Sequence, residues 1–323
     1  MTGTRRRTCP TIALVAALVI AAAAAAACSA HASGGAVAGS GGAATSSSAP
    51  AGSAAGSGKA GANDDWSRIA GALAWMQAVA PTKPVVALLG GSAARESTIS
   101  DQSWREQIVG DGGPATLAWN MGSHNRTMAQ NVAIVRALPK GVQAVVFVGI
   151  NLGSFTSTQK SAVIKLPSPA PTAPPSLEQP HQYGVSTTGI LSTGKKQAMV
   201  EEWLGKRYPV YKANFSRNAK LLETLIKLCR TRGYKPVLFE LPRNTQVIGG
   251  SLSAPTARFR AKCQSLAARY HIPWVSLVSA AKVPNPDFYD IWHLVEPGRT
   301  IWQKLLSAKT AALLKKYGYD GGA

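Results

Sequence analysis

The chain has 323 residues, of which 46% are hydrophobic, and it carries a formal net charge of +20 at pH 7. Its cysteines and histidines do not show the spacing of a zinc site. Its glycine-rich segments lack both the lysine of a P-loop and the spacing of a dinucleotide-binding motif. We therefore expect a domain with a sizeable core that uses neither a metal nor another cofactor.

The N-terminus is typical of a secretory signal. Three arginines, Arg5–Arg7, precede an alanine-rich apolar run over about residues 11–27, which is a signal-like layout rather than that of a stable membrane span. Ala25–Cys28 is similar to a bacterial lipobox with Cys28 as the lipidated residue, although a bulkier residue is usual at position 25. Ala30–Ala32 is an alternative site for ordinary release. We expect a signal peptide over residues 1–32 and favour a protein lipid-anchored on the extracellular face of the membrane over a secreted one.

Residues 33–63 consist largely of Gly, Ser and Ala, so they cannot bury enough apolar surface to fold. We expect a flexible linker there, followed by one domain over residues 64–323. Basic residues concentrate between Lys195 and Lys235. In an exported protein they favour anionic lipid headgroups or wall polymers over nucleic acid as partners. An ordinary solvated helix face explains these residues equally well.

Five short apolar runs are typical of parallel strands that are covered on both faces. Helical patterns alternate with them, which predicts an α/β fold with a doubly wound, parallel five-stranded sheet between two helical layers. The predicted strands are Val85–Leu89, Thr116–Met121, Ala144–Ile150, Pro236–Leu241 and Ile272–Leu277. One predicted helix starts at about Trp66, before the first strand. The other predicted helices cover Arg126–Leu138, Tyr211–Arg232, Thr256–Tyr270 and Pro297–Lys316.

A proline-rich insertion at about residues 154–208 breaks this alternation. It has several prolines between Pro167 and Pro175, followed by Gly189 and Gly194. It is too long for a simple connection, so a lid, a binding loop and a disordered excursion all remain open.

Small and polar residues follow the predicted strands. Ser92 follows the first strand, Gly122 the second and Asn151 the third, while His293 follows the fifth across a loop, with Asp290 three residues before it. Ligands of an open parallel sheet bind at the carboxyl ends of its strands. We therefore expect these residues to converge at one edge of the sheet.

These residue types suit acyl transfer. A serine hydroxyl becomes a good nucleophile when a base removes its proton, and His293 would be that base. Asp290 would orient the imidazole and stabilise its charged form. The developing oxyanion needs donors, which the backbone N–H groups of Ser92 and Gly122 and the side-chain amide of Asn151 would supply. His124 is the alternative base, a pocket residue or a surface histidine.

In this order, Ser92, Gly122, Asn151 and His293 resemble the signature residues of the SGNH (GDSL-like) hydrolases, and Asp290 matches the family aspartate. Over most of Val85–Lys316 the resemblance implies a flavodoxin-like sheet and hydrolysis or transfer of acyl esters. The usual Gly-Asp-Ser reads Gly-Gly-Ser here. The segment around Asp290 is also similar to that of wall-modifying members of the family.

We therefore expect an exported serine esterase that acts on O-acetyl or short acyl groups of carbohydrate, lipid or other envelope components. Two alternatives remain: an acyltransferase that modifies a cell-wall or exopolysaccharide polymer, and a non-catalytic envelope-binding module on the same fold.

Other residues keep two interpretations each. Cys229 and Cys263 form a disulfide or two separately buried thiols. Arg95 and Glu96 would pair locally on a helix after Ser92. The remaining candidates for substrate contacts have packing, turn or surface roles as alternatives: Trp203, Tyr208, Tyr211, Arg243 and Asn244. His181 and His271 have no carboxylate partner that the sequence reveals.

Overall fold

The computed structural model describes residues 63–175, 181 and 189–319, which all belong to one compact unit. The expected signal peptide, Cys28 and the linker up to residue 62 lie outside the described residues, as does part of the proline-rich insertion. Among the helices that are described, none has the length and apolar character needed to cross a bilayer.

Five parallel strands form one sheet in the order β2-β1-β3-β4-β5. This is the flavodoxin-like order, and it confirms the doubly wound sheet predicted from the sequence. In the register of the sheet, Gly90 lies beside Gly122, so the carboxyl ends of β1 and β2 are level. The strands are β1 (Val85–Gly90), β2 (Leu117–Gly122), β3 (Ala144–Ile150), β4 (Lys235–Glu240) and β5 (Trp274–Ser276).

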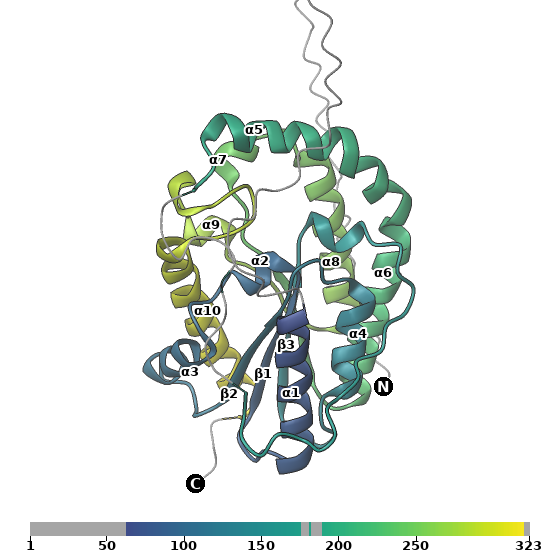
Figure 1. Cartoon of the computed structure of the whole chain (residues 1–323), viewed down its shortest axis with the longest axis vertical. Helices are drawn as coiled ribbons and strands as arrows, with labels where there is room; N and C mark the ends of the chain where they lie inside the picture. The colour runs from purple at the N-terminus through teal and green to yellow at the C-terminus, as the bar shows by residue number, and fades with distance from the viewer. Residues whose placement is uncertain (1–62, 176–180, 182–188, 320–323) are drawn as a thin grey trace, which may run out of the picture. The chain divides into compact units, whose positions relative to one another are not determined.

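Helices cover both faces of the sheet (Figure 1). Along β1, Val85 and Leu89 belong to one hydrophobic core while Val86 and Leu88 belong to the other, as the two-residue period of a strand requires. All four side chains are completely buried, and each such burial stabilises the fold by about 1.5–3 kcal/mol. The first core is covered by α1 (Asn63–Val79), α4 (Met128–Ala137), α6 (Tyr208–Thr231) and α8 (Ser253–Tyr270). The second core is covered by α3 (Asp101–Gly110) and α10 (Glu296–Lys316).

The proline-rich insertion is helical in its second half. Ser192 caps α5 (Thr193–Glu202) by accepting the Lys195 N–H, and a π-helical turn, η2 (Trp203–Arg207), connects α5 to α6. The sequence pattern did not predict α5, because its few apolar residues give only a weak helical period. The fifth strand is also shorter than predicted.

Short elements complete the edge of the sheet where the strands end. They are α2 (Ser92–Arg95), η1 (Leu152–Phe155), α7 (Thr245–Ile248), α9 (Val278–Ala281) and η3 (Asn285–Asp287). Each follows a strand or leads to the loop that carries Asp290 and His293, so this edge is where the predicted site residues gather.

Candidate active site

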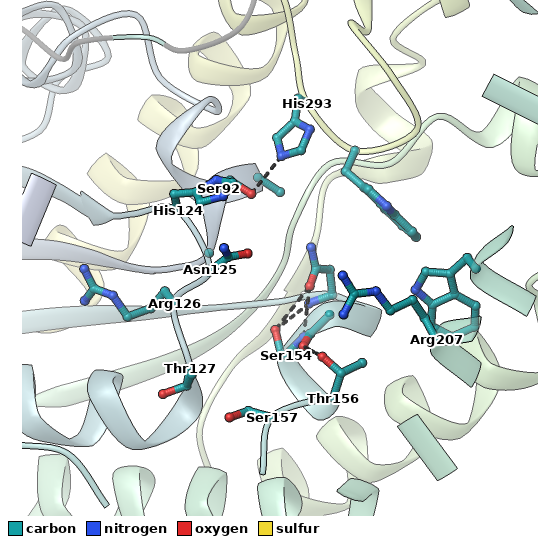
Figure 2. Close-up of a pocket in the computed structure, with 16 residues that line it drawn as sticks. Ser92, His124, Asn125, Arg126, Thr127, Ser154, Thr156, Ser157, Arg207 and His293 are labelled. Atoms are coloured by element: carbon teal, nitrogen blue, oxygen red, sulfur yellow. Dashed lines mark hydrogen bonds between the residues drawn. The ribbon is translucent and has the colours of Figure 1, made fainter. Parts of the chain in front are cut away.

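The carboxyl end of β1 leads directly to Ser92. A Cβ on Gly90 would lie 2.7 Å from the Cβ of Ala94, so a glycine here lets the chain turn tightly into α2. Ser92 is the first residue of α2, and its Oγ lies 2.8 Å from Nε2 of His293 (Figure 2). Nδ1 of His293 lies 2.7 Å from Oδ2 of Asp290. The structure thus brings the three predicted catalytic residues into one hydrogen-bonded chain.

The three-residue spacing of Asp290 and His293 has a local explanation. Oδ1 of Asp290 accepts the backbone N–H groups of Trp292 at 2.7 Å and of His293 at 2.9 Å. One carboxylate oxygen therefore holds the turn, and the other remains available to the imidazole. This arrangement fixes the direction in which the ring points.

The electrostatics of this pair are set by burial and by the mutual charges. Burial alone would raise the pKa of Asp290, but the charge of His293 and three hydrogen bonds lower it below its ordinary value. Burial alone would lower the pKa of His293, but the charge and hydrogen bond of Asp290 raise it above its ordinary value. The pair therefore favours a proton on Nδ1, which leaves Nε2 to accept the Ser92 hydroxyl proton.

A buried ionic network fixes α2 behind the nucleophile. The fully buried Glu96 carboxylate lies 2.7 Å from Arg95, 2.7 Å from Arg299 of α10 and 3.0 Å from Nδ1 of His181. Arg95 also contacts Asp65 of α1 at 2.8 Å. The local Arg95–Glu96 pair predicted from the sequence is present, but it is part of a network that ties α2 to both helical layers. His181 does have a carboxylate partner, from which 85 residues separate it.

The loop that carries Asp290 is fixed from the insertion. Lys196 of α5 is almost completely buried, and its Nζ donates to the carbonyl oxygens of Asn285 at 2.8 Å and Phe288 at 2.7 Å, and to Oδ1 of Asn285 at 2.9 Å. Asn244 adds a backbone N–H to the Ile291 carbonyl at 3.1 Å. The turn interpretation of Asn244 therefore agrees with the structure, and Lys196 is a buried cation that the sequence analysis missed.

Gly122 does not have the predicted place in the site. Its N–H donates to Oδ1 of Asn120 at 2.9 Å, and the residue does not line the cavity at Ser92. A Cβ here would lie 2.4 Å from the backbone N of Arg95. The predicted role of Gly122 as an oxyanion donor is therefore wrong, because its N–H is already used. Instead, its missing side chain lets β2 pack closely against α2.

Several N–H groups of the cavity residues make no hydrogen bond among the described residues, and they include the backbone N–H groups of Ser92 and Asn125 and Nδ2 of Asn151. Oδ1 of Asn151 accepts the N–H and O–H of Ser154, which fixes the amide with its NH₂ group unpaired. Asn125 has a left-handed backbone with φ of 51°, which asparagine tolerates better than most residues. The sequence offered one sign that residue 125 has this backbone conformation: it is an asparagine in the short loop that follows β2.

The cavity at Ser92 has a volume of about 300 Å³. It is lined by the loops after β1, β2 and β3, by the loop that carries His293, and by η2 of the insertion (Figure 2). Its lining side chains include four hydroxyls, two indoles and one guanidinium that points inward: Thr127, Ser154, Thr156, Ser157, Trp203, Trp292 and Arg207. Arg207, like Lys196, was not singled out from the sequence.

His124 also lines this cavity, but it is His293 that contacts Ser92. Burial, followed by the positive charges of His293 and Arg95, lowers the pKa of His124. His124 is therefore neutral at pH 7, and its position fits a pocket residue better than the alternative base.

The other residues with two interpretations have structural roles. Cys229 and Cys263 are separate buried thiols, and burial raises the pKa of Cys229 to about 12. Tyr211 is buried and donates to the Pro255 carbonyl at 2.9 Å, and Arg243 pairs with Glu240 at 3.3 Å. Within the described ranges, no group of three or more His, Cys, Asp or Glu side chains is arranged to hold a metal ion.

The fold and the site together define an α/β protein with a Ser-His-Asp arrangement at the carboxyl edge of a flavodoxin-like sheet. No protein-family model matches the chain, and no curated protein matches it. Solved structures to which it is similar include an extracellular lipase from Streptomyces rimosus (10% identity, 71% of this chain and 100% of that chain, TM-score 0.42). They also include a carbohydrate esterase of family 3 from Talaromyces cellulolyticus (12%, 72% and 98%, TM-score 0.39) and AlinE4, an SGNH-hydrolase family esterase (14%, 73% and 97%, TM-score 0.36).

Proposed function

We propose that this chain is an exported serine esterase of the SGNH type that cleaves O-acetyl or short acyl groups from carbohydrate or other envelope components. One observation carries the proposal: the hydrogen-bonded chain from Asp290 through His293 to Ser92. It lies at the edge of the sheet where ligands of this fold bind.

The geometry supports the following reaction. Ser92 Oγ attacks the ester carbonyl carbon while Nε2 of His293 takes the hydroxyl proton, and Asp290 stabilises the imidazolium. The carbonyl oxygen becomes an oxyanion, which the N–H groups of Ser92, Asn125 and Asn151 stabilise. When the intermediate collapses, the alcohol leaves with the proton from His293 and Ser92 holds the acyl group. Water then attacks the acyl-enzyme, with His293 again as the base.

The cavity supports a polar substrate. Hydroxyl groups and the Asn151 amide line it and two tryptophans contribute apolar surface, a combination that suits a carbohydrate ester better than a long acyl chain. The volume of about 300 Å³ is at the small end for ligand pockets, in keeping with a short acyl group on one sugar unit. The N-terminal sequence supports export, with Cys28 as the proposed lipid attachment site.

Transfer to a polymer hydroxyl is the second candidate, because it follows the same steps until water or an alcohol attacks the acyl-enzyme. The polar, open cavity favours an acceptor alcohol as much as water. Incubating the protein with an acetylated donor and a carbohydrate acceptor separates the two: free acetate alone supports the esterase, and acetylated acceptor supports the transferase.

The first test is labelling of the intact protein by a fluorophosphonate probe, with Ser92→Ala and His293→Ala as variants and His271→Ala as a matched control. We expect labelling in the wild type and the control and none in the two variants. A folded wild type that is not labelled and hydrolyses no ester would contradict the proposal and favour a binding module.

A further inference from the structure

One cation of the Ser92 cavity, Arg207, has no carboxylate partner in the part of the chain that the structure describes. Arg207 lies at the end of η2, and its guanidinium points into the cavity across from Ser92 (Figure 2). The Arg207 guanidinium makes no hydrogen bond or ion pair with another described residue. A guanidinium presents several N–H donors in a planar fork that matches a carboxylate or a phosphate.

The remaining charges around the cavity do not neutralise it. None of the lining residues is Asp or Glu. The other lining arginine, Arg126, points away from the cavity, where its guanidinium donates to Ser123 Oγ and stacks over the Trp66 ring at 4.5 Å (Figure 2). The nearest acidic residue along the chain, Glu202, pairs with Lys206 at 3.1 Å. Arg207 is therefore a lining cation whose guanidinium has no carboxylate partner among the described residues.

The local fold fixes the backbone turn that carries Arg207, whose side chain is exposed. Trp203, at the start of the same π-helical turn, is buried and stacks on Tyr208 with ring centroids 5.9 Å apart. Trp203, the first residue of the turn, is thus packed, and Arg207, the last residue, points into the cavity. π-helical turns occur frequently at functional sites. The Trp203 indole and the Arg207 guanidinium both line the cavity, as do the hydroxyls of Ser154 and Thr156.

We propose that the substrate is an acylated carbohydrate whose sugar also carries an anionic group, a carboxylate or a phosphate, and that Arg207 binds this group while Ser92 attacks the ester. This inference rests on the proposed esterase function and specifies its substrate. Arg207 acts as a specificity-determining residue, because it contacts the substrate away from the reacting bond.

The test compares four esters: 4-nitrophenyl acetate, and the methyl glycosides of glucose, glucuronic acid and glucose 6-phosphate, each acetylated at the same ring hydroxyl. The measured quantity is the ratio of kcat/KM for each anionic sugar to that for the neutral sugar. We expect a ratio of about ten or more in the wild type at low salt, since a charge-assisted hydrogen bond to an exposed side chain is partly screened. The larger of the two ratios identifies the anionic group.

Arg207→Gln should bring the ratio close to one, mainly through KM. Lys206→Gln is the matched control, because it removes the same charge from an adjacent side chain that is 76% exposed and outside the cavity. The control should keep the ratio of the wild type. A ratio near one in a wild type that hydrolyses 4-nitrophenyl acetate through Ser92 would overturn this inference alone. A wild type that hydrolyses none of the esters would overturn the esterase proposal and this inference with it.

Discussion

Asp290 holds His293 at two points, with Oδ2 at 2.7 Å from the imidazole Nδ1 and Oδ1 at 2.9 Å from the backbone N. Because the two contacts use different oxygens, the carboxylate fixes both the position and the tautomer of the base. The first prediction follows from the opposing effects of burial and of this charge on the His293 pKa.

His293 must be neutral to accept the Ser92 proton, so kcat/KM should rise with pH through the pKa of His293, at a midpoint above the ordinary value of 6.5. Asp290→Asn removes the charge that raises this pKa but leaves the burial that lowers it, so the midpoint should move to lower pH. We also expect kcat to fall by orders of magnitude. The pH profile of kcat/KM and an NMR titration of the imidazole measure both effects; equal midpoints in the two proteins would contradict the assignment.

The role of the Asn151 NH₂ group as an oxyanion donor can be tested while the hydrogen bonds from Ser154 to this side chain are kept. In Asn151→Asp the carboxylate still accepts the N–H and O–H of Ser154, but it has no N–H to donate to an oxyanion. We expect a fall in kcat of about 10²–10³-fold with little change in the melting temperature. Steady-state kinetics on an acetyl ester and thermal unfolding give the two readouts. Unchanged kcat in a folded variant would exclude Asn151 from the oxyanion site.

Two substitutions at position 125 test the backbone N–H of Asn125 separately from its side chain. Asn125→Gly keeps the N–H and adopts φ of 51° easily, so kcat should stay within about threefold of the wild type. Asn125→Val places a β-branched residue in a left-handed conformation, which costs about 1–3 kcal/mol and should displace the N–H. We expect a lower melting temperature and a reduced kcat for the valine variant. Equal kcat in both variants would show that this backbone segment does not contact the reacting oxygen.

Lys196 is a positioning residue for the loop that carries Asp290. Lys196→Met leaves the buried Phe288 carbonyl without a donor among the described residues, which should destabilise the protein by about 1–3 kcal/mol. The two Asn285 oxygens also lose Lys196, but they keep the Phe288 N–H and Nδ2 of Asn244 as donors. Measured well below the melting temperature, kcat should fall by more than KM changes, because the triad is misaligned while the cavity remains. The exposed neighbour provides the control, Lys195→Met, for which we expect wild-type kinetics. A purely structural role would lower the stability and leave kcat unchanged.

Glu96 is the buried carboxylate that pairs with Arg95 and Arg299 next to α2. Glu96→Gln removes the carboxylate that the guanidiniums of Arg95 and Arg299 share, and breaking a buried pair costs about 3–5 kcal/mol. Arg95 keeps its contact with Asp65. Urea unfolding monitored by tryptophan fluorescence measures the change. Glu202→Gln removes an exposed carboxylate that pairs only with Lys206 in the part of the chain described, and it should leave the midpoint nearly unchanged. Equal midpoints for the two variants would mean that the Glu96 network adds no stability.

The sequence could predict those parts of the site that depend on strand ends and on short spacing. Ser92 and Asn151 each follow a buried apolar run, and the order of the strands brings their ends together. Asp290 and His293 are three residues apart, a separation at which a carboxylate can bind both the backbone and the ring of the histidine. Gly122 illustrates the limit of this reasoning: it also ends a strand, but whether its N–H is free depends on the side chain of Asn120.

The sequence by itself determined the parallel sheet, its helical layers and the positions of the triad, because apolar periodicity and strand ends are local properties of the chain. The tertiary structure alone decided which N–H groups remain unpaired at Ser92, which buried partners Glu96 and Lys196 find, and that Arg207 of the insertion reaches the cavity. These contacts join residues far apart in the chain. Their partners are selected by packing and by the need to pair every buried charge, and no local pattern encodes that selection.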